Sequence, residues 1–380
     1  DSVEMVVNPH RFPRPRVGSR REISHDVPLR SWVDTDQIEP PTLRNEESES
    51  HRTTLPTVTD TGPTLSPIMS ALAERFDSHR NHLLSVGYRI TGSVADAEDA
   101  VQESWLRLRG TDHESIDDLR GWLTTVVGRI CLDRLKSAAV RRESYVGQWL
   151  PEPVVGAWNA GSGAAPDPLD SVVRSEDARL AAMVVLDTLT PPQRVAFVLH
   201  DGFSVPFGDI ASILGVTPAS ARQLASRARR QFGDAPDPVP DTEHDNAVTR
   251  LMAAMASGDL DRVVDALHPD CRLIGDSGGT TRTARRIVLG PDKCARFYLG
   301  LISKYGPQTL TSMRLASVNG QLGYFTAGLG GETGFPARAG GFTVRDGVVW
   351  AFYDFANPEK LHGVDSALTA PTAPGTTPPS

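Results

Sequence analysis

The sequence predicts a multidomain protein in which two all-α regions precede an α+β region. At 380 residues the chain is longer than one ordinary domain, so two or three domains are expected. Apolar residues recur at helical spacing in 70–145 and again in 174–232. After a Pro-rich break at 233–245 the pattern alternates, and it carries the hairpin dipeptides Asn319-Gly320 and Asp346-Gly347. The change of pattern at this break separates a helical part from a mixed part.

Composition excludes several classes of protein. With a formal net charge of −8, the chain is not a bulk nucleic-acid binder, so any contact with DNA must come from local basic patches. No apolar run approaches the roughly 18 residues of a membrane span, and the first 20 residues do not resemble a signal peptide. Cys131, Cys271 and Cys294 lie far apart without metal-ligand spacing. They indicate reduced thiols in a cytoplasmic protein. No metal, no cofactor and no membrane partner are expected.

Changes in composition divide the chain into seven segments. The two ends are rich in Pro and small or polar residues, which predicts disorder, and Gly and Pro mark the linkers. The predicted segments are a disordered extension (1–68), a first helical domain (69–145), a linker (146–173), a second helical domain (174–232), a short linker (233–243), the α+β domain (244–362) and a disordered tail (363–380).

The first helical domain is predicted to contain three helices. Apolar spacing predicts a helix over 69–92 that ends at Gly92, and Ser93 is a suitable N-cap for a second helix over 93–110. A third helix, over 117–143, has a basic C-terminal end. In the second domain Thr190 and Gln193 have the spacing of a capping box.

The stretch GVTPASARQLASRARRQF, residues 215–232, predicts a basic helix capped by Thr217 with Pro218 in its first position. Helical spacing places five residues on an inward face: Ala221, Leu224, Ala225, Ala228 and Phe232. It places six on an outward face: Ser220, Arg222, Gln223, Ser226, Arg227 and Arg230.

The preceding helix, PFGDIASILG, and the tight turn at 215–217 complete a helix-turn-helix. Arg pairs with guanine edges, Gln pairs with adenine, and both reach phosphates. An arginine-rich surface helix in solvent is the alternative, and the scaffold helix and turn favour the helix-turn-helix.

Three stretches in this order, DAEDAVQESWLRL, RGWLTTVVGRICLDRLK and 189–232, resemble bacterial sigma factors of the extracytoplasmic-function (ECF) family. WLPEP (149–153), DSGG (276–279) and NPEKL (357–361) resemble the sigma-J type, a subgroup with a fused C-terminal SnoaL-like domain. The resemblance covers about 69–362. It implies sigma domain 2 at 69–145, helix-turn-helix domain 4 at 174–232, and a cone-shaped α+β SnoaL-like (NTF2-like) domain at 244–362.

The resemblance implies a protein that binds core RNA polymerase and directs recognition of the −10 and −35 promoter elements and transcription initiation. Its acidic helix would grip the clamp of the largest polymerase subunit through Glu98, Asp99, Gln102 and Glu103. Asp99 and Glu103 are like charges four residues apart, and a basic partner would relieve their repulsion. A solvated acidic face is the alternative reading of the same pattern.

The resemblance also assigns the promoter contacts. The −35 element would be read by the outward face of 218–232, although Leu224 stands where the family commonly has Arg. The −10 element would be melted and held by Arg120, Trp122, Arg129, Arg134, Lys136 and Arg141. Trp122 also fits a core position, and Gly128-Arg129 stands where the family often has Arg-Asn. Fully extended, the linker spans roughly 80–90 Å, enough for promoter elements roughly 70 Å apart.

For the C-terminal domain the resemblance implies regulation in cis through contacts between the domains. The residues assigned to these contacts are Trp149, Pro151, Asp276, Gly278, Gly279, Asn357 and Lys360. Catalysis is not expected, because His268, Asp270, Asp276 and Asp354 show no nucleophile–base spacing. A small-molecule ligand in the pocket of this domain stays open. The alternative function is a ligand-sensing or enzymatic SnoaL-like protein with a repressor-type helix-turn-helix.

Overall fold

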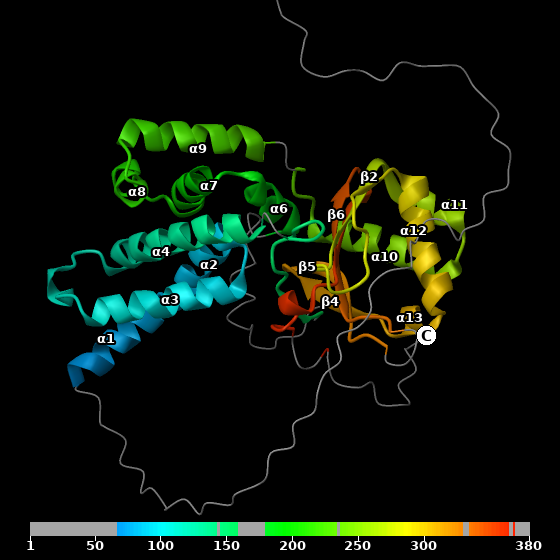
Figure 1. Ribbon diagram of the computed structural model, residues 1–380, viewed down its shortest axis with the longest axis horizontal. Helices are drawn as coiled ribbons and strands as arrows, with labels where there is room; N and C mark the ends of the chain where they lie inside the picture. The colour runs from blue at the N-terminus through cyan, green and yellow to red at the C-terminus, as the bar shows by residue number, and fades with distance from the viewer. Residues whose placement is uncertain are drawn as a thin grey trace, which may run out of the picture. The chain divides into compact units, whose positions relative to one another are not determined.

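The computed structural model describes residues 67–142, 145–158, 179–233, 236–329, 334–364 and 368, without the side chains of 67–68, 113 and 139–142. All the described residues belong to one compact unit (Figure 1). The expected disorder of 1–68 and 363–380 concerns residues that lie almost wholly outside this description. So do the linker residues 159–173 and the side chain of Arg141.

The first helical domain contains α1 (Pro67–Asp77), α2 (Arg80–Thr91), α3 (Val94–Arg109), the 3-10 turn η2 (His113–Ser115) and α4 (Leu119–Arg142). The single helix expected over 69–92 is divided into α1 and α2. At the break the Ser78 hydroxyl donates to the Arg75 carbonyl at 2.7 Å, so a side chain competes for the helix backbone. The predicted cap is confirmed, because Ser93 Oγ accepts a hydrogen bond from Asp96 N at 3.2 Å.

The second helical domain contains α6 (Leu180–Thr188), α7 (Pro191–Phe197), the π-helical turn η4 (Val198–Gly202), α8 (Phe207–Leu214) and α9 (Pro218–Phe232). Thr190 N donates to Gln193 Oε1 at 3.0 Å, as the capping box predicts. Thr217 Oγ1 accepts from Ser220 N at 3.2 Å, and Gly215 takes a φ of +67° between α8 and α9. The caps and the turn confirm the predicted helix-turn-helix.

In this structure the two helical domains pack into one hydrophobic core. Helix α4 lies against α7 and α8, and Leu123 and Val127 belong to the same apolar cluster as Leu199. Gly128 lies at this contact: a Cβ atom there would be 3.1 Å from Leu199. The missing side chain therefore lets the two domains approach closely.

The C-terminal domain is α+β, as predicted. Its helices are α10 (Asp241–Ser257), α11 (Leu260–Asp265), α12 (Pro291–Tyr305), α13 (Gln308–Thr311) and the 3-10 turn η5 (Pro358–Lys360). Its strands are β2 (Leu267–Asp276), β3 (Val288–Leu289), β4 (Arg314–Val318), β5 (Gln321–Thr326), β6 (Arg338–Arg345) and β7 (Val348–Phe355).

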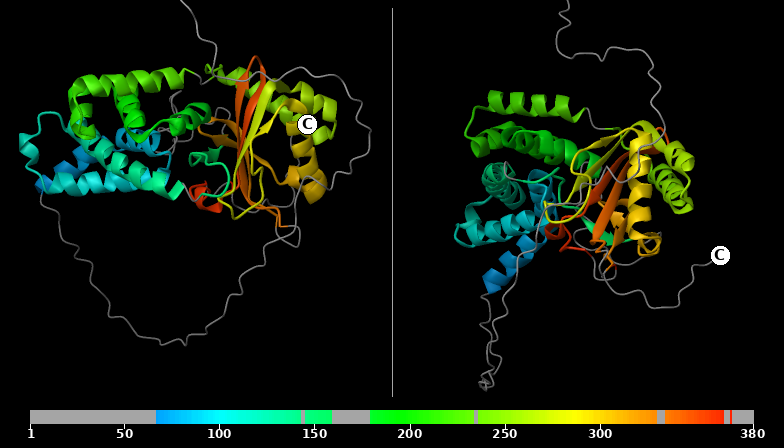
Figure 2. Two further views of the ribbon diagram at one scale, coloured as in Figure 1. Left: turned by 45° about the horizontal axis from the view of Figure 1, so that its top comes forward. Right: turned by 45° about the vertical axis from the view of Figure 1, so that its right-hand side comes forward.

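Together with β1 (Val155–Ala157), these strands form one sheet in the order β1-β4-β5-β6-β7-β2-β3, in which only β2 and β7 are parallel neighbours. Helices α10, α11 and α12 lie along one side of the sheet (Figure 2). Both predicted hairpins are confirmed, since Asn319 and Asp346 take φ values of +51° and +53° ahead of Gly320 and Gly347.

Strand β1 (Val155–Ala157) comes from the segment expected to be a linker, yet it forms an edge of this sheet. It pairs antiparallel with β4, with Val155 opposite Val318. Leu150 and Val155 of the linker and Leu180 of α6 join Phe355 of β7 in one apolar cluster. The first part of the linker is thus built into the C-terminal domain.

Candidate nucleic-acid interface and linker clamp

Helix α9 presents the predicted polar face to solvent. Ala221, Ala225 and Ala228 are fully buried, and Leu224 and Phe232 pack partly against the same core. Of the six outward residues, Arg222, Gln223, Ser226, Arg227 and Arg230 are exposed and Ser220 is half-buried. The outward arginines are therefore free to meet an anionic partner.

Arg222 is positioned by an aromatic ring at the start of α8. Its guanidinium carbon lies 5.5 Å from the centroid of the Phe207 ring, a cation–π contact. The His200 ring stacks on Phe207 at 3.8 Å, and its Nδ1 lies 3.1 Å from the Val205 carbonyl oxygen. That carbonyl selects the His200 tautomer with a proton on Nδ1.

Arg229, on the same helix, forms an ion pair within the second helical domain. Its Nε and Nη2 both donate to Asp201 Oδ1, at 2.9 and 2.6 Å, and this tie joins α9 to η4.

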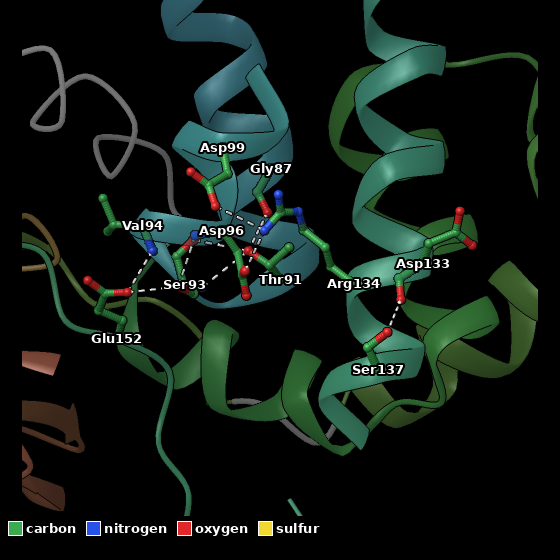
Figure 3. A network of polar contacts seen from close by, with 10 residues as sticks. All are labelled: Gly87, Thr91, Ser93, Val94, Asp96, Asp99, Asp133, Arg134, Ser137 and Glu152. Atoms are coloured by element: carbon green, nitrogen blue, oxygen red, sulfur yellow. Dashed lines mark hydrogen bonds and ion pairs between the residues drawn. The ribbon is translucent and has the colours of Figure 1, made fainter. Parts of the chain in front are cut away.

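The acidic helix α3 neutralises part of its own charge. Glu98, Asp99 and Gln102 are exposed, whereas Glu103 is half-buried and pairs with Arg107 at 2.5 Å. In Figure 3 Arg134 of α4 reaches α3, where its Nη1 lies 3.0 Å from Asp96 and 3.2 Å from Asp99. The repulsion between Asp99 and Glu103 is therefore relieved within the chain.

The residues predicted for the −10 element lie along α4 in different environments. Arg120, Arg129 and Lys136 are exposed, whereas Trp122 is half-buried against the shared core. Arg134 is half-buried by the ion pairs just described. Partial burial opposes its charge, but Asp96 and Asp99 outweigh this and raise the pKa of Arg134.

A histidine network lies where the two helical domains meet. Arg120 Nη2 lies 3.0 Å from His82 Nδ1, so this nitrogen accepts and the proton is on Nε2, which lies 2.9 Å from Thr124 Oγ1. The His82 ring meets Phe203 of the second domain edge-on at 5.1 Å. Burial, followed by the charges of Arg120 and its neighbours, lowers the pKa of His82 from 6.5 to about 4.

A buried carboxylate at the end of β2 grips the linker. Asp276 is fully buried. Its Oδ2 accepts a hydrogen bond from Leu150 N at 2.9 Å and forms an ion pair with Lys360 Nζ at 2.6 Å. Its Oδ1 accepts a hydrogen bond from the Tyr145 hydroxyl. Lys360 also donates to the Leu150 carbonyl, and its Nζ lies 3.3 Å from the centroid of the Trp149 ring. We call Tyr145, Trp149, Leu150, Asp276, Asn357 and Lys360 the linker clamp.

The remaining residues predicted for the interdomain contact lie at the same place. Asn357 Nδ2 donates to the Tyr145 hydroxyl at 3.0 Å. A Cβ atom added to Gly278 would lie 2.7 Å from Asn357, and one added to Gly279 would lie 2.9 Å from Val146. Both glycines also have positive φ, so a larger residue would be strained at either position. Pro151 is buried beside the clamp. Burial and the hydrogen bond to Asp276 raise the pKa of Tyr145.

Three residues that were not predicted as site residues, Tyr88, Glu152 and Asn319, connect the clamp to the first helical domain. Glu152 Oε2 accepts from Ser93 Oγ at 2.9 Å and from Val94 N at 2.8 Å (Figure 3). Burial raises the pKa of Glu152, and these hydrogen bonds oppose the shift.

The Tyr88 hydroxyl donates to the Glu152 carbonyl at 2.8 Å and accepts from Asn319 Nδ2 at 2.7 Å. Together with Tyr145, these residues complete the path from domain 2 through the linker to the sheet. A hairpin Asn is usually exposed, whereas Asn319 is fully buried.

The candidate polar groups of the C-terminal domain are not brought together. His268 lies 3.5 Å from Asp346 and accepts from Asp270 N, whereas Asp276 belongs to the linker clamp. Asp354 is buried in an ion pair with Arg338 at 3.1 Å. Among the described residues, no cluster of His, Cys, Asp or Glu could hold a metal.

Asp354 and Arg338 line a small cavity of about 20 Å³. Its other lining side chains include Met255, Tyr298 and Met313. Within the described part of the chain, three buried atoms on the lining residues have no hydrogen-bond partner: Asp354 Oδ1, Arg338 Nε and the Tyr298 hydroxyl. The residues that line the cavity therefore carry unpartnered donors and an unpartnered acceptor.

Comparison with known proteins extends this picture. Residues 75–141 match the family Sigma-70 region 2, and residues 179–232 match Sigma-70, region 4. The ECF RNA polymerase sigma factor SigJ of Mycobacterium tuberculosis (strain ATCC 25618 / H37Rv) is 56% identical over 294 residues, 76% of this chain and 92% of that protein. The chain belongs to the ECF sigma factors.

Two further relatives agree with this assignment. The crystal structure of the M. tuberculosis extracytoplasmic function sigma factor SigJ covers 77% of this chain and 99% of its own, with a TM-score of 0.66 and 53% identity. The probable ECF sigma factor SigI of M. tuberculosis (strain CDC 1551 / Oshkosh) is 36% identical over 220 residues, 57% of this chain and 72% of that protein. As an ECF sigma factor, this chain binds core RNA polymerase and directs it to promoters. None of the described helices is long and apolar enough to cross a bilayer.

Proposed function

We propose that this sigma factor is regulated in cis by its C-terminal domain, which grips the linker and thereby keeps the two helical domains packed together. The observation that carries the proposal is the buried Asp276–Lys360 pair, which binds both the N–H and the carbonyl of Leu150. The path through Glu152 and Tyr88 then ties the same linker to domain 2. Promoter elements roughly two helical turns apart require the helical domains to separate, so activation requires this grip to loosen.

For the polymerase we propose that α3 binds the clamp of the largest subunit. The exposed Glu98, Asp99 and Gln102 support this assignment, with Glu103 at the edge of the surface. Arg134 then serves to hold α3 against α4, and a basic partner surface would compete with it for Asp99.

For the promoter we propose that α9 enters the major groove at the −35 element. Its exposed residues Arg222, Gln223 and Ser226 support base contacts, with Ser220 beside them, and Arg227 and Arg230 support phosphate contacts. At the −10 element the exposed Arg120, Arg129 and Lys136 support phosphate contacts. Trp122, Arg134 and Arg141 belong to the same proposed surface, which is reshaped when the helical domains separate. Such a protein acts where chromosomal DNA is, in the cytoplasm.

We also infer that the cavity of the C-terminal domain takes a small polar molecule. The three unpartnered atoms of Asp354, Arg338 and Tyr298 support this, although the present volume holds about one water molecule. A larger ligand requires the flexible Met255 and Met313 to move. A ligand found in a thermal-shift screen should stabilise the parent protein and not Asp354→Asn; equal shifts in both proteins would locate it elsewhere.

The experiment for regulation in cis measures binding of the full chain to purified core polymerase. Asp276→Asn and Lys360→Met each leave one partner of a buried pair uncompensated, which costs on the order of 3–5 kcal/mol. Each variant should loosen the grip on Leu150 and bind core polymerase more tightly than the parent. The double variant, which buries no unpaired charge, should fold better than either single variant.

Asp270→Asn is the matched control, since Asp270 is exposed on the same strand. Equal affinities of the parent, both single variants and the control would contradict regulation through the linker clamp. If the parent protein did not bind core polymerase at all, the result would instead contradict its function as a sigma factor. Salt-sensitive binding to an operator without polymerase is the outcome that the repressor-type alternative predicts.

A further inference from the structure

Two of the three cysteines lie side by side in the C-terminal domain. Cys271 is on β2, and Cys294 is in the first turns of α12. Gly290 connects their backbones, because its N–H donates to the Cys271 carbonyl at 2.9 Å and its carbonyl accepts from Cys294 N at 3.1 Å. Both side chains are also buried in the same apolar cluster of this domain. Their separation in the sequence concealed this pairing.

The contact makes the two thiols chemically unequal. The neighbouring Cys294 side chain lowers the pKa of Cys271, whereas the Cys271 side chain and burial raise the pKa of Cys294. Since the thiolate is the nucleophilic form, Cys271 is the better nucleophile of the pair. Cys131 lies in the helical core, where burial raises its pKa to about 12, so it provides an internal comparison.

We propose that Cys271 and Cys294 form an oxidisable dithiol that hydrogen peroxide converts into a disulfide linking β2 to α12. The Cys271 thiolate attacks one oxygen of the peroxide and breaks the O–O bond, which gives a sulfenic acid and, after protonation, one water. The Cys294 sulfur then attacks the Cys271 sulfur and displaces a second water. In balance, two thiols and one peroxide give one disulfide and two waters.

The surroundings restrict the oxidant to a small molecule. Both side chains are only 2% exposed, and Cys294 Sγ lies 3.6 Å from the carbonyl oxygen of Val288 in β3. Strand β3 is two residues long and forms the edge of the sheet, so opening it breaks few hydrogen bonds. Hydrogen peroxide enters such an opening, whereas a bulky disulfide reagent does not. Neither cysteine belongs to the linker clamp, so the proposed oxidation does not depend on the proposed regulation. Cys271 and Asp276 do lie on the same strand, β2.

The test uses the full chain, treated with hydrogen peroxide, alkylated under denaturing conditions and digested with trypsin. Mass spectrometry should find the peptide 263–272 linked to the peptide 294–296, while Cys131 stays alkylated. Cys294→Ser should accumulate a sulfenic acid on Cys271 that dimedone traps. Cys271→Ser should give no trapped adduct on Cys294.

Serine is close in size to cysteine, and the melting temperature of each variant shows that it folds. Complete alkylation of Cys271 and Cys294 after peroxide treatment of the parent would overturn the proposal. A disulfide that involves Cys131, or one between two chains, would overturn it equally. A sulfenic acid that forms on Cys294 rather than Cys271 would overturn the assigned order of attack.

Discussion

At the scale of single residues, the linker clamp concentrates charge where water is excluded. Asp276 is fully buried and Lys360 nearly so, yet both charges are compensated by each other and by the Leu150 backbone. The Trp149 ring against Lys360 Nζ adds a cation–π contact in a desolvated place. Replacing either Asp276 or Lys360 should therefore lower the free energy of unfolding much more than replacing one partner of an exposed ion pair such as Arg296–Asp292.

Base reading at the −35 element also depends on single side chains. Replacing Arg222 or Gln223 by Ala should cost about 1–3 kcal/mol at one base position of the −35 element and relax the preference there. Phe207→Leu keeps an apolar side chain but removes the ring beneath Arg222, so it should relax the same position more weakly. The measurement is holoenzyme binding to a set of promoters with each −35 base varied.

Arg230→Ala is the comparison, since loss of a phosphate contact should weaken binding to all promoters alike. An unchanged base preference in the Arg222 and Gln223 variants would contradict their assignment to base edges.

At the scale of elements, the contact between α2, α4 and the second helical domain depends on a neutral imidazole. His82 Nδ1 accepts from Arg120, and Thr124 Oγ1, which lies next to Nε2, donates to the Arg120 carbonyl. Protonation of His82 Nδ1 would break the hydrogen bond that Arg120 donates to it. It would also place a positive charge on the imidazole next to the Arg120 guanidinium. Phe203 of the second domain lies against the same ring, so the charge would appear at the contact between the domains.

This network predicts acid sensitivity. The folded-state pKa of His82, about 4, lies below its ordinary value of 6.5. Between these values the unfolded chain binds more protons, so stability falls as pH is lowered from 6.5 towards 4. His82→Gln should therefore show a smaller fall in melting temperature between pH 6.5 and 4.5 than the parent protein. His362→Gln, at an exposed position, is the control; equal falls in all three proteins would show that His82 does not carry the effect.

The sequence predicted those elements whose causes are local. Capping at Ser93 and Thr217, the hairpin turns at Asn319 and Asp346, and the inward alanines of α9 follow from neighbours within a few positions. Apart from Tyr145, the residues of the linker clamp lie in short motifs that resemble those of one subgroup.

The rest depends on pairings between distant residues, which spacing cannot reveal. Tyr88 meets Asn319, and Arg134 of α4 meets Asp96 and Asp99 of α3. The linker residues 155–157 carry no signal that they complete a sheet whose neighbouring strand lies far along the chain. For the same reason the contact between Cys271 and Cys294 could not be expected.

At the scale of the whole molecule, one chain carries both the proposed promoter-reading surfaces and the domain proposed to regulate them. The helical domains have one core, Gly128 allows their close approach, and the linker is part of the C-terminal sheet. Engaging two promoter elements requires the shared core to open. We therefore expect two arrangements of the same chain, of which core polymerase favours the one with separated helical domains.

The most direct test is energy transfer between dyes attached at the exposed positions 137 on α4 and 212 on α8 of the full chain. Free protein should give high transfer, since both helices belong to the shared core. On binding core polymerase, transfer should fall, as the domains move apart towards the roughly 70 Å between promoter elements. Asp276→Asn should lower transfer even without polymerase. Transfer that stays high in the polymerase-bound complex would show that the helical domains do not separate, and it would contradict regulation through the linker clamp.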